Sequence, residues 1–218
     1  MRQIYERVAP FYDLLDLPAE YLRYQKIRPQ MFAGLKGRIL DAGIGTGRNI
    51  PFYPEQCDVV GIDLSPSMLK RARTRRDRTD VKVELLEMDI CQTTFPDASF
   101  DAVVSTFLFC VLDDALQLSA LQELARVCRK GGEIRLLEYS LPESPVHRFA
   151  MKRVWTPWVR WVYGAEFDRN TEQYCTASKL ELVNRQFLYR GIIKLITLRH
   201  STCCDDNTEK LRRTETYC

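Results

Sequence analysis

The sequence predicts an α/β protein with a doubly wound, Rossmann-like sheet of seven strands, mostly parallel with one antiparallel strand near the C-terminus. Through the middle of the chain, short apolar runs typical of buried parallel strands alternate with helical stretches. Three glycines follow the first apolar run, as in turns that bind a ligand between a strand and a helix. Near the C-terminus, two apolar runs meet at Gly191 with no room for a crossover helix, so we expect those two strands to be antiparallel.

The composition is that of a globular protein with one core. Of the 218 residues, 45% are hydrophobic and 28% are charged. Lys and Arg number 32 against 29 for Asp and Glu, and this balance argues against a nucleic-acid partner. The first residues lack the apolar core of a secretory signal, and no run approaches the roughly 20 apolar residues of a spanning helix. We therefore expect a soluble, cytoplasmic, single-domain protein.

The elements follow from periodicity and from punctuation by Gly, Pro and polar residues. Strands are expected at residues 37–42, 58–64, 81–88, 100–107, 133–139, 180–190 and 191–199. A helix is expected after the glycines, and another from Pro66 to Arg76, where Ser65 is suited to cap the N-terminus. Apolar residues at helical spacing predict a helix over residues 115–128, capped by Gly131 and Gly132.

The eight cysteines do not form a recognisable site. They include no CxxC pair and no set with zinc-ligand spacing, and the chain has only two histidines, His147 and His200. We expect reduced thiols and no metal site. Residues 201–218 form a polar stretch without periodicity and are expected to be a flexible tail.

The most informative stretch is the glycine cluster, Asp41-Ala42-Gly43-Ile44-Gly45-Thr46-Gly47. A dinucleotide fingerprint, GxGxxG, requires a glycine at position 48, where this chain has Arg48. The spacing is instead GxGxG, with an acid two residues before the first glycine. That acid suits a ligand with an amino group better than a pyrophosphate. The alternative is that the glycines only form a tight turn.

Two more acids follow the next two strands. Asp63 ends the second strand, where a carboxylate can accept hydrogen bonds from both hydroxyls of a ribose. Asp89 ends the third strand, where a side-chain acceptor meets an exocyclic adenine amine. Either acid alone is equally consistent with a solvated loop. Three acids at consecutive strand ends, beside a GxGxG turn, favour a nucleoside-binding site.

These motifs together resemble a known family. The runs ILDAGIGTG, VVGIDLSPSML, EMDI, FDAVVSTFLFCVL and ELARVCRKGGEIRLLEYS are similar in order and spacing to the motifs of class I S-adenosylmethionine-dependent methyltransferases. The opening YERVAPFYD is typical of the branch that contains the ubiquinone/menaquinone C-methyltransferases and the bacterial phosphatidylethanolamine N-methyltransferases. The resemblance covers roughly residues 1–200. One departure is Ala177-Ser178-Lys179-Leu180, where family members usually have Ala-Gly-Leu.

The resemblance implies S-adenosylmethionine as the cofactor and a role for each matching position. The loop residues would wrap the methionine part, Asp41 would orient its amino group, and Asp63 would hold the ribose. Packing on the adenine and reading of its edge would fall to residues of the second and third units, and one strand-end hydroxyl would face the sulfonium. The loop residues are Gly43, Gly45, Thr46 and Gly47. The adenine-side residues are Leu64, Met68, Asp89 and Ile90, and the hydroxyl that would face the sulfonium belongs to Thr106.

The acceptor side is less determined. In similar enzymes, a segment corresponding to residues 1–36 folds over the cofactor as helices of a lid, and residues 140–179 would cover the acceptor. Tyr5 and Tyr12 are expected to line the pocket, with half-buried packing as the alternative. Glu138, an acid in an apolar strand, is a candidate catalytic group together with Tyr12, unless a buried partner holds it. Cys110 is a candidate lining residue or a core thiol.

The function that follows is methyl transfer to a hydrophobic or lipid-like small molecule, such as a phospholipid amine or a quinol. A free amine loses its proton readily, whereas a quinol hydroxyl benefits from a base, so the need for general-base catalysis stays open. The alternatives are an NAD(P)-type oxidoreductase on a related fold and a non-catalytic cofactor-binding protein. Arg48 argues against the oxidoreductase.

Two basic stretches call for different interpretations. Residues 70–78, KRARTRRDR, lack interleaved aromatic residues and are expected to be a solvated helix face. Residues 148–163 hold all three tryptophans and several basic residues but no acid. Aromatic bulk with uncompensated positive charge is typical of segments that rest on an anionic membrane surface. We expect transient membrane contact there, with packing beneath the lid as the alternative.

Overall fold

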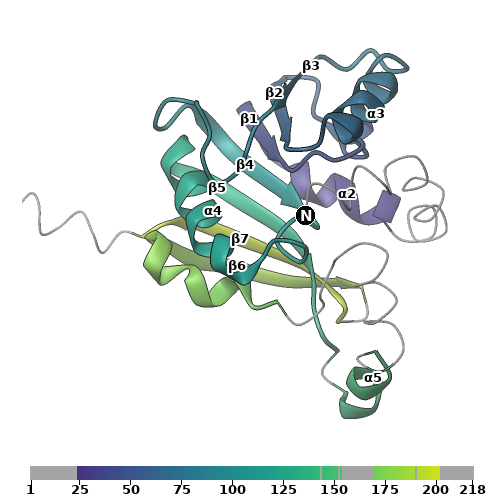
Figure 1. The fold of residues 1–218 in the computed structure, drawn as a ribbon, viewed down its shortest axis with the longest axis vertical. Coiled ribbons are helices and arrows are strands. Elements are labelled where there is room, and N and C mark those ends of the chain that lie inside the picture. The colour runs from purple at the N-terminus through teal and green to yellow at the C-terminus, as the bar shows by residue number, and fades with distance from the viewer. Residues whose placement is uncertain (1–23, 143, 152, 154–168, 190, 202–218) are drawn as a thin grey trace, which may run out of the picture.

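The computed structural model describes residues 24–201, apart from 143, 152, 154–168 and 190. Seven strands form one sheet in the order β3-β2-β1-β4-β5-β7-β6 (Figure 1). The strands are β1 (Gly37–Ala42), β2 (Cys57–Asp63), β3 (Val83–Glu87), β4 (Phe100–Thr106), β5 (Cys128–Tyr139), β6 (Leu180–Tyr189) and β7 (Ile193–His200).

The strand directions match the predicted fold. The first five strands run parallel to one another, and β7 runs antiparallel to both of its neighbours, β5 and β6. The chain order reverses between β1 and β4, because β2 and β3 lie on one side of β1 and the later strands lie on the other. In open α/β sheets, ligands bind outside the carboxyl ends of the strands at such a reversal. The predicted doubly wound, mostly parallel sheet is therefore confirmed.

Helices cover both faces of the sheet. The described part of the chain contains α2 (Gln25–Phe32), α3 (Pro66–Arg76), α4 (Asp114–Val127) and α5 (Pro145–Ala150), with 3-10 turns at η2 (Ile50–Phe52), η4 (Thr171–Tyr174) and η5 (Thr176–Ser178). Alternate strand residues point to opposite faces. Thus Leu40 and Val60 pack with α4 in one apolar cluster, whereas Ile39 and Val59 pack with α2 and α3 in another.

Two predicted local features are wrong. No α-helix follows the glycines. The stretch before β2 forms turns and η2, because Pro51 and Pro54 limit helical hydrogen bonding there. In the described residues, α-helices follow β2, β4 and β5, whereas none follows β1 or β3.

The second wrong feature is the expected glycine cap after α4. The helix ends at Val127 and β5 begins at once with Cys128, whose backbone is extended. Gly132 instead lies within β5, beside a register shift against β4. A Cβ there would lie 2.6 Å from the carbonyl oxygen of Asp101, so the glycine permits a close approach of two strands.

The C-terminal hairpin turns at Gly191 as predicted, with the glycine in the left-handed region at φ 72°. No helix of the described residues is long and apolar enough to cross a membrane. The predicted flexible tail, most of the predicted lid and the three tryptophans lie outside the described residues.

Candidate active site

The carboxyl ends of the central strands bring the predicted polar residues to one end of the sheet. Asp41 is the penultimate residue of β1, Asp63 and Thr106 end β2 and β4, and Glu138 is the penultimate residue of β5. These four strands are consecutive in the sheet and parallel. Their side chains therefore border the loops at the chain reversal, where the fold predicts a ligand site.

Asp41 is completely buried. Its Oδ2 atom accepts hydrogen bonds from Tyr53 Oη at 2.5 Å and from Asn49 Nδ2 at 2.9 Å. Its Oδ1 atom is also buried and has no hydrogen-bond partner among the described residues. Burial raises the pKa of the Asp41 carboxyl, although the two donors and the positive charge of Arg28 act in the opposite direction.

Asn49 connects Asp41 to two other parts of the site. The same Nδ2 atom lies 3.0 Å from Thr106 Oγ1 at the end of β4, and its Oδ1 atom accepts a 2.7 Å hydrogen bond from Arg28 Nη1 on α2. Asn49 and Arg28 are both buried. This network links the helix that precedes the sheet to the two strand ends beside the chain reversal.

The glycine loop is held tightly against β2. The amides of Gly43 and Ile44 both donate to the carbonyl oxygen of Ile62 at 2.9 Å. Gly45 has φ 58°, and a Cβ built on it meets no atom within 4 Å, so the backbone there is open to a close-approaching ligand. Gly47 serves packing instead, because a Cβ there would lie 3.0 Å from the Cα of Ala72 on α3.

Asp63 fastens the same loop from the end of β2. Its Oδ2 accepts a hydrogen bond from the Gly45 amide at 2.9 Å, and its Oδ1 accepts one from the Ser65 amide at 2.9 Å. Burial raises the pKa of the Asp63 carboxyl, partly offset by these amides. The carboxylate therefore positions the loop that borders the site, in addition to its predicted role toward a ribose.

One arginine of the basic helix is not part of a solvated face. Arg75 on α3 donates to the carbonyl oxygen of Thr46, and its Nη1 lies 3.1 Å from Thr46 Oγ1. Thr46 is buried, and Arg75 is half-buried. The interpretation of residues 70–78 as a uniformly solvated face is therefore wrong at Arg75, which supports the glycine loop from the outside.

The predicted adenine-side residues surround the ends of β2 and β3. Leu64 is 42% exposed, whereas Met68 on α3 and Ile90 are buried. Asp89 is exposed, and its Oδ1 accepts a 2.8 Å hydrogen bond from the amide of Cys91. Leu64 and Asp89 thus present accessible apolar and acceptor groups beside the end of the sheet.

Glu138 and Cys110 form one buried unit on the other side of Thr106. The two carboxylate oxygens of Glu138 accept 2.9 Å hydrogen bonds from the amides of Phe109 and Cys110. The Cys110 thiol donates to the carbonyl oxygen of Phe107 at 3.2 Å. Burial raises the pKa of Glu138 to about 7 and also raises that of Cys110. The acid thus fixes the loop that follows β4.

An aromatic cluster completes this side of the site. Phe107, directly after Thr106, stacks on Tyr139 with ring centroids 4.6 Å apart and contacts Tyr24 at 5.0 Å. The hydroxyls of Tyr24 and Tyr139 lie 2.7 Å apart. Phe107 has φ 54°, a conformation that costs a non-glycine residue on the order of 1 kcal/mol and that recurs at functional sites.

Sequence reasoning missed several of these residues. Asn49 and Tyr53 follow the glycine loop in Asn49-Ile50-Pro51-Phe52-Tyr53, where two hydrogen-bonding side chains interrupt an apolar stretch. That interruption was the available signal. Arg28 carried none, because its partner lies 21 positions away. Two predicted residues, Tyr5 and Tyr12, lie outside the described residues.

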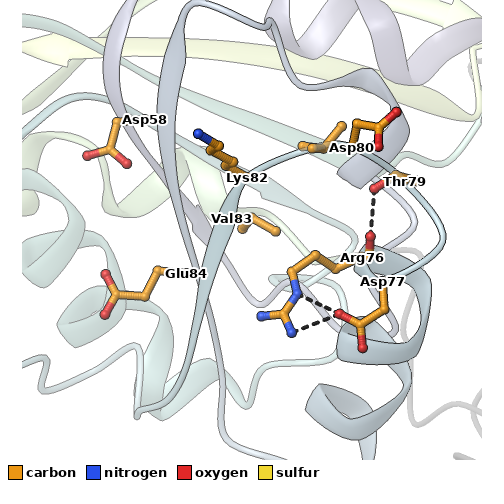
Figure 2. Close-up of a pocket in the computed structure, with 9 residues that line it drawn as sticks. Asp58, Arg76, Asp77, Thr79, Asp80, Lys82, Val83 and Glu84 are labelled. Atoms are coloured by element: carbon orange, nitrogen blue, oxygen red, sulfur yellow. Dashed lines mark hydrogen bonds and ion pairs between the residues drawn. The ribbon is translucent and has the colours of Figure 1, made fainter.

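A surface hollow of about 490 Å³ lies elsewhere, at the amino ends of β2 and β3 (Figure 2). Its lining carries both charges, and Figure 2 shows the guanidinium of Arg76 paired with Asp77 at its rim. Because parallel strands share their direction, this hollow is at the opposite end of the sheet from Asp41 and Asp63. It is therefore separate from the site described above.

Comparisons with known proteins identify the family of the chain. The family described as "Methyltransferase domain" matches residues 39–132. A phosphatidylethanolamine N-methyltransferase from Cereibacter sphaeroides is 41% identical over 105 residues, which are 47% of this chain and 51% of that protein. The chain thus matches about half the length of that relative.

A demethylmenaquinone methyltransferase from Thermus thermophilus is 34% identical over 162 residues, which cover 69% of this chain and 73% of that protein. Among solved structures, a geranyl diphosphate C-methyltransferase from Streptomyces coelicolor A3(2) has the same fold, with a TM-score of 0.65 at 14% identity, covering 81% of this chain and 77% of that one. The chain belongs to the class I S-adenosylmethionine-dependent methyltransferases, in the group of the ubiquinone/menaquinone C-methyltransferases.

Proposed function

We propose that the protein transfers a methyl group from S-adenosylmethionine to a hydrophobic, lipid-like small molecule, a phospholipid amine or a quinol. The observation that carries the proposal is the site at the carboxyl ends of β1, β2 and β4, where a buried acid, an open glycine loop and a strand-end acid lie together. Membership of the methyltransferase family identifies the cofactor as S-adenosylmethionine. The printed names of the relatives, a phospholipid N-methyltransferase and a demethylmenaquinone methyltransferase, support the acceptor class.

The residues of the site fit this cofactor. Asp41 Oδ1 is buried, none of the residues that the structure describes donates to it, and the amino group of the methionine part would supply a donor. Gly45 leaves open backbone for the same part. Asp63 lies at the end of β2 in the position of the ribose-binding acid of related folds. Leu64 and Asp89 are accessible to the adenine and its exocyclic amine.

The chemistry requires alignment more than activation. When bound, S-adenosylmethionine would supply a methyl carbon for in-line attack by the acceptor, with cleavage of the carbon–sulfur bond and S-adenosylhomocysteine as the leaving group. Holding the reactants in attack geometry contributes on the order of 7 kcal/mol in favourable cases. In our proposal, Asp41, Asp63 and the glycine loop hold one partner, and Thr106 faces the sulfonium from the end of β4. The stacked rings of Phe107 and Tyr139 would form an apolar wall on the acceptor side.

On the acceptor side, Glu138 and Tyr12 are the proposed acid–base groups, and Tyr5, Tyr12 and Cys110 are the proposed lining residues. A pKa near 7 lets Glu138 exchange a proton near neutral pH. The carboxyl is bonded to the amides of Phe109 and Cys110, so it also sets the position of the loop beside Thr106. A quinol acceptor would use the proton-accepting role, and an amine acceptor only the positioning role.

We further propose that residues 148–163 contact an anionic membrane transiently and so bring the enzyme to its acceptor. Supporting this, Val146 and Phe149 on α5 are 75% and 71% exposed, and α5 stands away from the sheet in Figure 1. Arg153 is also exposed. Met151, just after α5, packs against Cys110 and Val111, so the described beginning of this segment adjoins the acceptor-side loop.

Calorimetry with two ligands tests the cofactor part of the proposal. The purified protein is titrated with S-adenosylhomocysteine and, separately, with NAD. We expect saturable binding of S-adenosylhomocysteine and none of NAD. Binding of NAD alone would instead support the oxidoreductase alternative.

A further inference from the structure

We infer that Asn49 is a positioning residue for the methionine end of the cofactor, acting through Asp41. In this inference, Asn49 occupies one oxygen of the Asp41 carboxylate and leaves the other for the ligand's amino group. It rests on the proposed function, because it takes S-adenosylmethionine as the ligand. It adds a residue that follows the glycine loop and that the motif comparison does not include.

The amide of Asn49 is fully engaged. Its Nδ2 lies 2.9 Å from Asp41 Oδ2 and 3.0 Å from Thr106 Oγ1, which accounts for its two hydrogens. Its Oδ1 accepts from Arg28 Nη1 at 2.7 Å. Asn49 thus joins the acid expected to meet the amino group to the hydroxyl expected to face the sulfonium.

Only one orientation of the amide satisfies these partners. With the amide reversed, its oxygen would face the carboxylate of Asp41, and its NH₂ group would face the guanidinium of Arg28, so like partners would meet at both ends. Arg28 therefore dictates the orientation of Asn49 from α2. Since all three residues are buried, water does not substitute readily for any of these bonds.

Both protein donors converge on the same oxygen of Asp41. Tyr53 Oη and Asn49 Nδ2 each donate to Oδ2, whereas Oδ1 is buried and has no donor within the described part of the chain. A buried carboxylate oxygen without a donor is unfavourable unless a ligand supplies one. A primary ammonium group is the matching donor, because its positive charge also compensates the buried carboxylate. The pairing of donors on one oxygen thus keeps the other in place for that group.

If Asn49 acts through Asp41, its substitution should weaken the binding only of ligands that carry the amino-acid group. S-adenosylhomocysteine carries the amino-acid group, whereas 5′-methylthioadenosine has the same adenine, ribose and sulfur without it. Asn49→Asp nearly preserves the volume but replaces the NH₂ donor by a carboxylate beside Asp41. We expect it to weaken S-adenosylhomocysteine binding at pH 8 by tenfold or more and to change 5′-methylthioadenosine binding by less than twofold.

Two companion variants make the result decisive. Asn49→Ala removes the donor without adding a charge and should show the same selective loss, so it decides the question if the Asp variant does not fold. Asp63→Ala should weaken both ligands, because both contain the ribose. Thermal unfolding of each variant is measured first. A similar loss for both ligands in the Asn49 variants, or no loss for either, would overturn the inference. If the unsubstituted protein binds neither ligand, the proposed function itself fails.

Discussion

Arg75 on α3 donates a hydrogen bond to the carbonyl oxygen of Thr46, so the glycine loop after β1 is tied to the helix after β2. Its guanidinium also reaches Thr46 Oγ1 at 3.1 Å. Together with the bond from the Gly45 amide to Asp63, this contact holds the loop from two directions. The loop proposed to hold the cofactor is thus fixed by contacts within the protein itself.

Replacing Arg75 by Ala should loosen the loop and weaken cofactor binding. Loss of these hydrogen bonds is worth about 1 kcal/mol, or roughly a fivefold rise in the dissociation constant of S-adenosylhomocysteine. Arg73→Ala is the matched control, because Arg73 is an exposed arginine of the same helix. Calorimetry should separate the two variants, and equal affinities would show that Arg75 does not support the site.

Replacing Asp63 by Ala should weaken binding more. The variant loses the ribose contact and the acceptor for the Gly45 amide, and hydrogen bonds to a charged group are worth about 1.5–3 kcal/mol. Asp63→Asn keeps one acceptor oxygen and should lose less. Asp58→Ala serves as control, since Asp58 is exposed at the opposite end of the same strand. If the Asp63→Ala protein binds S-adenosylhomocysteine as tightly as the parent, the ribose lies elsewhere.

The buried acid Glu138 should make stability depend on pH. Burial raises its pKa from 4.5 to about 7, so the native state binds a proton that the unfolded state has released between these values. The associated stability is fully present below pH 4.5 and is lost as the pH rises through about 7. By linkage, this loss is on the order of 3 kcal/mol.

The variant Glu138→Gln tests this linkage, because an amide does not titrate. Gln also places an NH₂ group against the amide of Phe109 or Cys110, which should destabilise the variant by an amount that does not depend on pH. Urea unfolding at pH 5 and pH 8 should show the stability advantage of the parent shrinking as the pH rises. A difference that is constant across this range would mean that Glu138 is ionised throughout.

The membrane proposal predicts salt-sensitive binding to anionic vesicles. Sedimentation with phosphatidylglycerol vesicles should carry the protein into the pellet, whereas phosphatidylcholine vesicles should not. Phe149→Ala with Arg153→Ala should reduce the bound fraction, as should Trp158→Ala with Arg160→Ala. Phe187→Ala with Arg185→Ala is the control, because it removes an exposed aromatic and a basic residue from β6. If the protein is absent from both pellets, the membrane proposal is wrong, and the alternative that residues 148–163 pack beneath the lid is favoured.

Much of the fold was predictable because its signals are local. Apolar runs mark strands buried on both faces, and Ser65 with Pro66 marks the start of α3, whose bounds agree with the prediction. The two wrong predictions have physical causes outside these local signals. Prolines prevent a helix after the glycines, and Gly132 is needed for the close approach of Asp101 to β5 and not for capping α4.

The site residues likewise fall into two groups, those with a local sequence signal and those without one. Asp41, Asp63 and the glycines were predictable, because strand ends and glycine spacing can be read in sequence. Asn49, Arg28 and Arg75 act through partners that the fold brings together, over 8 to 29 positions of sequence. A basic run such as residues 70–78 predicts a solvated face on average, and only the packing distinguishes Arg75 from its neighbours.

Methyl transfer itself is the most direct test of the account. The purified protein is incubated with S-adenosylmethionine labelled in its methyl group and with fractionated lipid extract, and the label is then followed into each fraction. We predict label in a fraction that contains phospholipid amines or quinols, and a large reduction with the Asp63→Ala variant. Label that appears in no lipid fraction, or that enters only water-soluble compounds, would contradict the proposed function.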